Sequence, residues 1–122
     1  MFRIVAATTD TALAAGLIAA LEGAAAIIRS APETPSLAEL CGKAKPDLIL
    51  LDADPIEGFG TALTEAVRAV GAADPDAPII VLGDEGDARS VLRAIRAGAA
   101  DVIDRGSDRE ALRSQLGPHL AG

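Results

Sequence analysis

The sequence predicts one α/β domain with a five-stranded parallel sheet and helices on both faces. Runs of large apolar residues recur along the 122 residues, and segments with helical spacing alternate with them. The run from Leu48 to Leu51 contains no polar residue, which is typical of a strand buried on both faces. Asp52 follows directly. We therefore expect its carboxylate at the carboxyl edge of the sheet, where ligands bind in open α/β sheets.

The predicted strands are short and mostly apolar, at residues 2–7, 25–29, 47–51, 78–82 and 101–104. Helices are predicted at residues 12–22, 36–43 and 61–70, then from Asp84 or Asp87 to Gly98, and from 107 to about 117. Ser36 and Ser107 are each followed three residues later by Glu, which is the form of a capping box. In the fourth helix we expect Val91, Leu92 and Ile95 to face the core.

Composition excludes several classes of function. The formal net charge of −7 disfavours binding to nucleic acid, whose phosphates would repel the domain. Cys41 is the only cysteine and His119 the only histidine, so an internal disulfide, a multi-cysteine zinc site and a Ser-His-Asp triad are not expected. No apolar run approaches the roughly 20 residues that span a membrane, and residues 12–21 lack the basic flank of a signal peptide. We expect a cytoplasmic domain with no membrane partner.

Three segments together resemble the receiver domain of response regulators in two-component systems. They are residues 46–52 followed by Pro55 and Gly58-Phe59, residues 77–82, and residues 97–103. The resemblance covers residues 1–122 as one domain. It implies a flavodoxin-like sheet of order 2-1-3-4-5 and a signalling role in a phosphorelay rather than an enzyme activity. It also implies that Asp52 is the phosphoacceptor candidate, and that a histidine kinase or a downstream signalling protein is the partner.

The sequence departs from the family at its other site positions. The acidic pair that holds Mg²⁺ in receivers falls on Thr8 and Thr9. Asp10 follows and could hold a metal together with Asp52, or it could cap the helix. The two switch positions, which are a hydroxyl residue and an aromatic residue in the family, are Gly83 and Val102. The lysine that pairs with the phosphoryl group in the family is replaced by Arg105. The guanidinium group of Arg105 could pair with a phosphoryl group or with Asp52 itself.

These residues leave three hypotheses for the function. The first is an atypical, pseudo-receiver domain that acts mainly as a protein-interaction module, through its last two helices and fifth strand, with a homodimer as one expected form and no cofactor. The second is a working receiver that takes a phosphoryl group onto Asp52 with Mg²⁺. The third is a small α/β enzyme or nucleotide binder, which is disfavoured because no Gly-x-Gly-x-x-Gly or Walker-type loop follows the first strand. The chain is expected to be a single-domain regulator or a piece of a longer protein.

Overall fold

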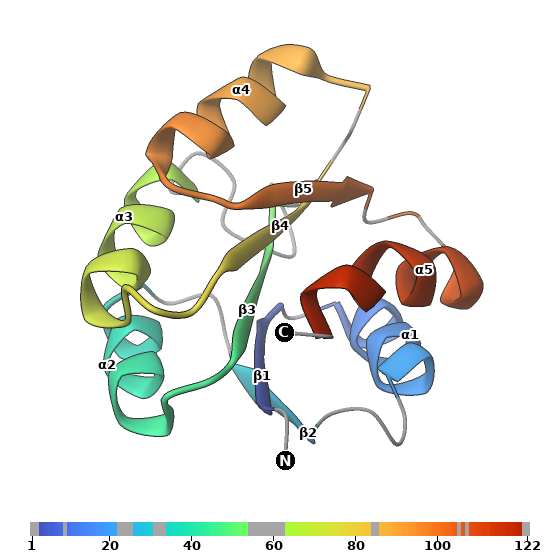
Figure 1. The fold of residues 1–122 in the computed structure, drawn as a ribbon, viewed down its shortest axis with the longest axis horizontal. Coiled ribbons are helices and arrows are strands. Elements are labelled where there is room, and N and C mark those ends of the chain that lie inside the picture. The colour runs from blue at the N-terminus through green and yellow to red at the C-terminus, as the bar shows by residue number, and fades with distance from the viewer. Residues whose placement is uncertain are drawn as a thin grey trace.

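A parallel β-sheet forms the centre of the fold, and helices cover its two faces (Figure 1). The computed structural model describes residues 3–8, 10–21, 26–30, 34–53, 63–83, 86–104, 106 and 108–120. The strand order is β2-β1-β3-β4-β5, and the strands are β1 (Arg3–Ala7), β2 (Ala26–Ser30), β3 (Leu48–Asp52), β4 (Ile79–Gly83) and β5 (Asp101–Asp104). The helices are α1 (Thr11–Leu21), α2 (Thr34–Ala44), α3 (Leu63–Ala73), α4 (Ala88–Ala97) and α5 (Arg109–Leu120). The predicted α/β architecture with a parallel sheet is confirmed.

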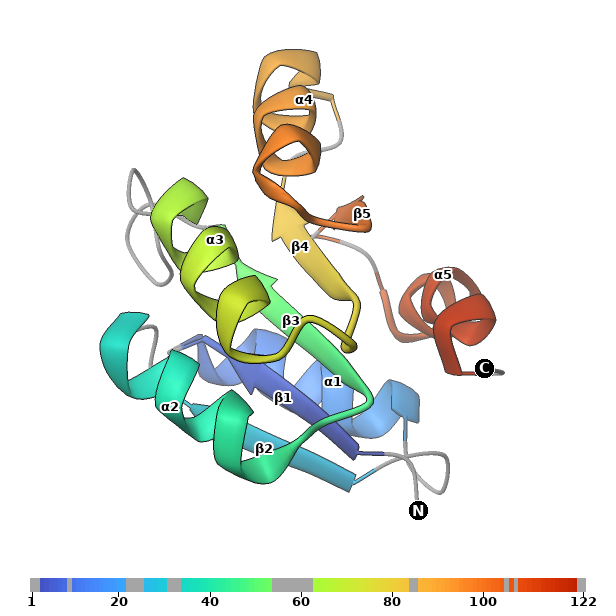
Figure 2. The ribbon, with the colours of Figure 1, turned by 60° about the vertical axis from the view of Figure 1, so that its left-hand side comes forward.

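Two apolar clusters lie on opposite faces of the sheet, because successive side chains of a strand point to opposite sides. One cluster joins the sheet to α2 and α3 and includes Val5, Ile49, Val81, Leu37 and Val67. The other joins the sheet to α1 and α5 and includes Ile4, Leu50, Leu82, Leu17 and Leu112. Figure 2 shows α2 and α3 on one side of β1 and β3 and α1 on the other. Every residue of β3 is buried, as the uninterrupted apolar run predicts.

Aspartates cap three of the helices. The Asp10 carboxylate accepts hydrogen bonds from the backbone N–H groups of Ala12 and Leu13, at 3.0 and 3.1 Å. Asp87, one of the two predicted caps of α4, accepts from the backbone N–H and the hydroxyl of Ser90. Asp108 caps α5 by accepting from the Ala111 N–H at 2.8 Å. The predicted cap of this helix, Ser107, lies outside the described residues.

Three predicted helix ends are wrong. α2 begins at Thr34, two residues before Ser36, and its Pro35 occupies the first turn, where a missing N–H is tolerated. α3 continues past residue 70, the predicted last residue, to Ala73, and the N–H of Asp74 still bonds to the carbonyl of Val70 at 2.9 Å. α5 continues to Leu120, so Pro118 lies inside its last turn and does not end it. No described helix has the length and apolar character that would let it cross a membrane.

The helix α4 packs differently from the prediction. Of its residues only Ala94 is buried, while the side chains of Leu92 and Ile95 are 49% and 42% exposed. The inward orientation predicted for these two residues is therefore wrong, and Val91 is only half-buried. α4 packs against α3 and the edge strand β5, so little of the sheet is available to cover its large apolar residues (Figure 2). Helical spacing predicted the apolar positions but not which face the sheet would cover.

Candidate functional site

The carboxyl edge of the sheet brings the ends of four strands together. Thr8 follows β1, while Asp52, Gly83 and Asp104 are the last residues of β3, β4 and β5. Strand pairing places Asp52 beside Leu82 and Gly83 beside Asp104. The pairing continues one residue further, because the N–H of Ala53 donates to the carbonyl of Leu82 at 2.8 Å. The candidate site is therefore held by backbone hydrogen bonds of the sheet, as expected for an open α/β fold.

Asp52 is buried at the centre of this edge, with an exposed fraction of 0%. Such a carboxylate requires polar partners, because burial of an unpaired charge is costly. One partner is Thr8, which is 3% exposed and donates its hydroxyl proton to Oδ2 of Asp52 over 2.5 Å. The two residues are 44 positions apart in the chain and meet because β1 and β3 are neighbours. A predicted acidic-pair position thus contacts the phosphoacceptor candidate through a hydroxyl group.

Asp10 is linked to Asp52 through Thr8. The backbone N–H of Asp10 donates to the Thr8 hydroxyl oxygen at 3.0 Å, while its own Oδ1 accepts the two α1 amides described above. Of the two roles that the sequence allowed, the structure therefore contains the helix cap. Among the described residues, no group of three or more His, Cys, Asp and Glu side chains comes together in a way that could hold a metal ion. The role of Asp10 as a metal ligand stays a prediction.

The two predicted switch positions, Gly83 and Val102, lie beside each other on β4 and β5. A Cβ atom added at Gly83 would lie 3.4 Å from Cβ of Ala53 and 3.8 Å from Cγ1 of Val102. Val102 is half-buried and packs against the cluster on the α2 and α3 face. The space that a hydroxyl side chain would occupy is thus bordered by the valine that stands at the aromatic position. Arg105 and Thr9, the remaining two candidates, lie outside the described residues.

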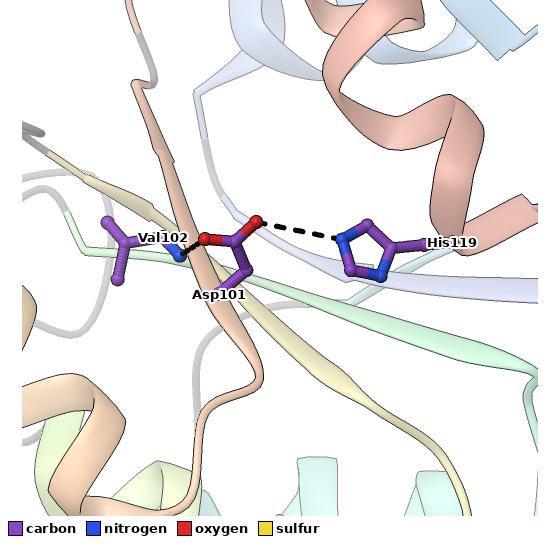
Figure 3. Close-up of polar contacts among 3 residues, drawn as sticks. All are labelled: Asp101, Val102 and His119. Carbon is purple, nitrogen blue, oxygen red and sulfur yellow. Dashed lines mark hydrogen bonds and ion pairs between the residues drawn. The ribbon is translucent and has the colours of Figure 1, made fainter.

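One polar contact had no signal in the sequence. Nε2 of His119, near the end of α5, lies 3.7 Å from Oδ2 of Asp101 at the start of β5. Figure 3 shows the imidazole pointing toward this carboxylate. The other oxygen of Asp101 accepts the backbone N–H of Val102 at 2.8 Å. The contact is an ion pair only when the imidazole is protonated. The contact lies between the last turn of α5 and β5, the strand that carries Val102. Asp101 and His119 are brought together only by the fold.

Cys41 is not a reactive thiol in this structure. It is fully buried in α2, and burial together with the nearby charge of Asp74 raises the pKa of its thiol from 9.0 to about 11. The thiolate, which is the nucleophilic form, is therefore scarce at neutral pH. Cys41 therefore behaves as a small buried apolar residue.

Comparisons with known proteins identify the family. The family model described as "Response regulator receiver domain" matches residues 4–117. Comparison with curated proteins gave no match. Among solved structures, a response regulator from Thermotoga maritima is 19% identical with a TM-score of 0.84, and the match covers 100% of this chain and 99% of that one.

Two further solved structures are similar. A CheY-like protein, TadZ, from Pseudomonas aeruginosa is 21% identical with a TM-score of 0.81, over 100% of this chain and 95% of that chain. The BeF3-activated receiver domain of DrrB is 19% identical with a TM-score of 0.77, over 100% and 99% of the two chains. These likenesses establish the fold, and the family model covers nearly the whole chain. The chain therefore belongs to the response regulator receiver domains of two-component signalling.

Proposed function

We propose that this receiver domain acts mainly as a protein-interaction module and that its phosphorylation site is degenerate. The observation that carries the proposal is the hydrogen bond from the Thr8 hydroxyl to buried Asp52, at a position where receivers have a carboxylate. A hydroxyl that donates to Asp52 supplies no negative charge, whereas Mg²⁺ is held by carboxylate and other oxygen ligands. The residues present therefore do not fit the metal that the family's reaction needs, and no cofactor is expected.

The switch positions support the same proposal. A phosphoryl group can bias a second conformation only if it interacts differently with the two conformations. Gly83 offers no side-chain hydroxyl, and Val102 offers no aromatic ring that could move between two environments. Even a phosphorylated Asp52 would thus lack the side chains that report the event in other receivers. Output through a constant binding surface is the simpler expectation.

The partner that we propose is a protein, either a histidine kinase or a downstream signalling protein, in the cytoplasm. The surface formed by α4, β5 and α5 is the candidate contact, and it exposes Ile95 on α4 together with Asp101 and Asp104 on β5. A homodimer through this surface is included in the proposal. Nucleic acid and membrane partners are not included in the proposal, because the net charge of −7 disfavours binding to an extended anionic surface.

Incubation with acetyl phosphate and Mg²⁺, followed by intact-mass measurement, tests the degenerate site. We expect no added phosphoryl mass in the wild type under conditions that modify a receiver with an intact acidic pair. The alternative, a working phosphoacceptor, is favoured by the position of Asp52 at the carboxyl end of β3. It would be established by a Mg²⁺-dependent mass increase that Asp52→Asn abolishes. Light-scattering mass in the same samples reports on the homodimer.

A further inference from the structure

A groove lies between α3 and α4. Figure 2 shows these two helices as neighbours, apart from α1 and α5. Its volume is about 320 Å³. From α3 it is lined by Thr64 and Arg68, and from α4 by Arg89, Leu92, Arg93 and Arg96, among others. The α4 residues follow the spacing i, i+3, i+4 and i+7, which puts them on one face of the helix. The groove therefore combines guanidinium groups from two helices with one exposed leucine.

The charge of this groove is opposite to that of the whole domain. Four of the 11 basic residues of the chain line it, although the formal net charge is −7. All four arginines are exposed, and no ion pair joins them to a carboxylate of the described residues. The pKa of Asp87 is lowered mainly by hydrogen bonds from Ser90, and the positive charge of Arg89 makes a smaller contribution. Four like charges on two facing helices repel one another, so an anionic occupant would relieve that repulsion.

The size of the occupant follows from the range of electrostatic forces. At physiological salt, charges interact over about 8 Å, so a ligand seated in the groove experiences mainly the arginines. A long polyphosphate, a membrane plane or a second copy of this acidic chain would extend beyond the groove and meet the remaining negative surface. A short segment avoids that repulsion. The 49% exposed side chain of Leu92 in the same lining favours a segment that also carries an apolar side chain.

We infer that the α3–α4 groove binds a short acidic segment of a partner protein, with carboxylates on both sides of an apolar side chain. Carboxylates suit the site because the planar guanidinium group can donate two parallel hydrogen bonds to them. The Arg68 side of the groove and the Arg93 side would each hold one carboxylate, and Leu92 would contact the apolar side chain. The inference rests on the proposed role as an interaction module, and it names the chemistry of the partner. It does not depend on the state of Asp52.

Fluorescence anisotropy with a fluorescein-labelled peptide, in which glutamates flank a central leucine, tests this inference. The titration uses the full chain without Mg²⁺ or phosphoryl donor. We expect saturable binding that Arg68→Glu/Arg93→Glu weakens about tenfold or more, equivalent to about 1.4 kcal/mol. The matched control is Lys43→Glu/Lys45→Glu, which makes the same change in net charge at two exposed positions outside the groove lining. The ion pair that this control breaks, Lys43 with Glu39, is exposed and contributes little to stability.

Several outcomes would overturn the inference. They are an absence of binding, equal loss in the two double variants, or equal binding of a peptide with glutamine in place of glutamate. Tighter binding of a single-stranded oligonucleotide or a phosphatidylserine vesicle, lost in Arg68→Glu/Arg93→Glu, would assign the groove to another class of ligand. A dimer mass by light scattering that is lost in the same variant would assign it to a second copy. Circular dichroism and melting of each variant verify that it is folded.

The result is separable from the test of the phosphorylation site. If the peptide does not bind while Asp52 stays unmodified by acetyl phosphate, the groove inference fails and the degenerate site stands. If Asp52 is phosphorylated and the peptide still binds, the degenerate site fails and the groove stands.

Discussion

The carboxyl edge of the sheet and the outer face of α4 are built in opposite ways. At the edge, a carboxylate is withdrawn from solvent and bonded to the Thr8 hydroxyl. On α4, by contrast, charged and large apolar side chains are left exposed, and only Ala94 is buried. Burial fixes the first region, whereas little packing restrains the second. This difference is the one that the proposed function expects, with buried Asp52 contributing to the fold and the surface around α4 contacting partners.

Truncation of one leucine in each region gives the largest expected contrast. Leu50 is fully buried in β3, so Leu50→Ala should lower the free energy of unfolding by about 2–5 kcal/mol. Leu92 is 49% exposed, so Leu92→Ala should change it by about 0.5 kcal/mol or less. Urea denaturation measures both values. Similar losses in the two variants would mean that α4 is packed as firmly as the central sheet.

The buried hydrogen bond between Thr8 and Asp52 should contribute more to stability than the exposed polar contacts of α4. Thr8→Val keeps the shape but removes the hydroxyl, leaving Asp52 without that partner, and should cost about 1–3 kcal/mol. Thr8→Ser retains the donor and serves as the control. Urea midpoints of the two variants provide the comparison. A Thr8→Val protein with the same urea midpoint as the wild type would contradict the structural role that we assign to the Asp52 carboxylate.

Cys41 should make the buried region sensitive to alkaline pH. Its thiol pKa is raised to about 11 in the folded protein against 9.0 in a solvated thiol, so the neutral form is stabilised by folding. This contribution is complete below pH 9 and is lost as the pH rises through about 11. Thermal melts across this range should fall more steeply for the wild type than for Cys41→Ala. Parallel curves would contradict the assigned cause.

The smallest effect is expected at the start of α4. Hydrogen bonds from the side chain and backbone of Ser90 lower the pKa of exposed Asp87, so its charged form favours the helix. The contribution is present above the ordinary pKa of an aspartate and is lost as the pH falls through the lowered value. Asp87→Asn should remove this acid dependence with little change at neutral pH. Hydrogen exchange of the Ser90 amide in both proteins measures it, and identical acid profiles would argue against the cap.

The sequence predicted the central sheet better than its surroundings, for a physical reason. Continuous apolar runs such as Leu48 to Leu51 can only be satisfied by burial on both faces, so the strands and the position of Asp52 followed directly. The orientation of α4 did not, because periodicity gives the apolar positions of a helix without saying how much sheet lies beneath them. The contact of Thr8 with Asp52 was also beyond sequence reasoning, since it joins residues 44 positions apart.

Whether Mg²⁺ binds at the carboxyl edge tests most directly the central claim that this site is degenerate. The measurement is a Mg²⁺ titration followed by amide NMR and by melting temperature, in the wild type and in Thr8→Asp, which restores one carboxylate of the acidic pair. We predict no saturable shift at Thr8, Asp10 or Asp52 and no stabilisation in the wild type, and Mg²⁺-dependent stabilisation in Thr8→Asp. Saturable wild-type shifts at both Asp10 and Asp52 would contradict the account, because they would mean that these two carboxylates hold the metal after all.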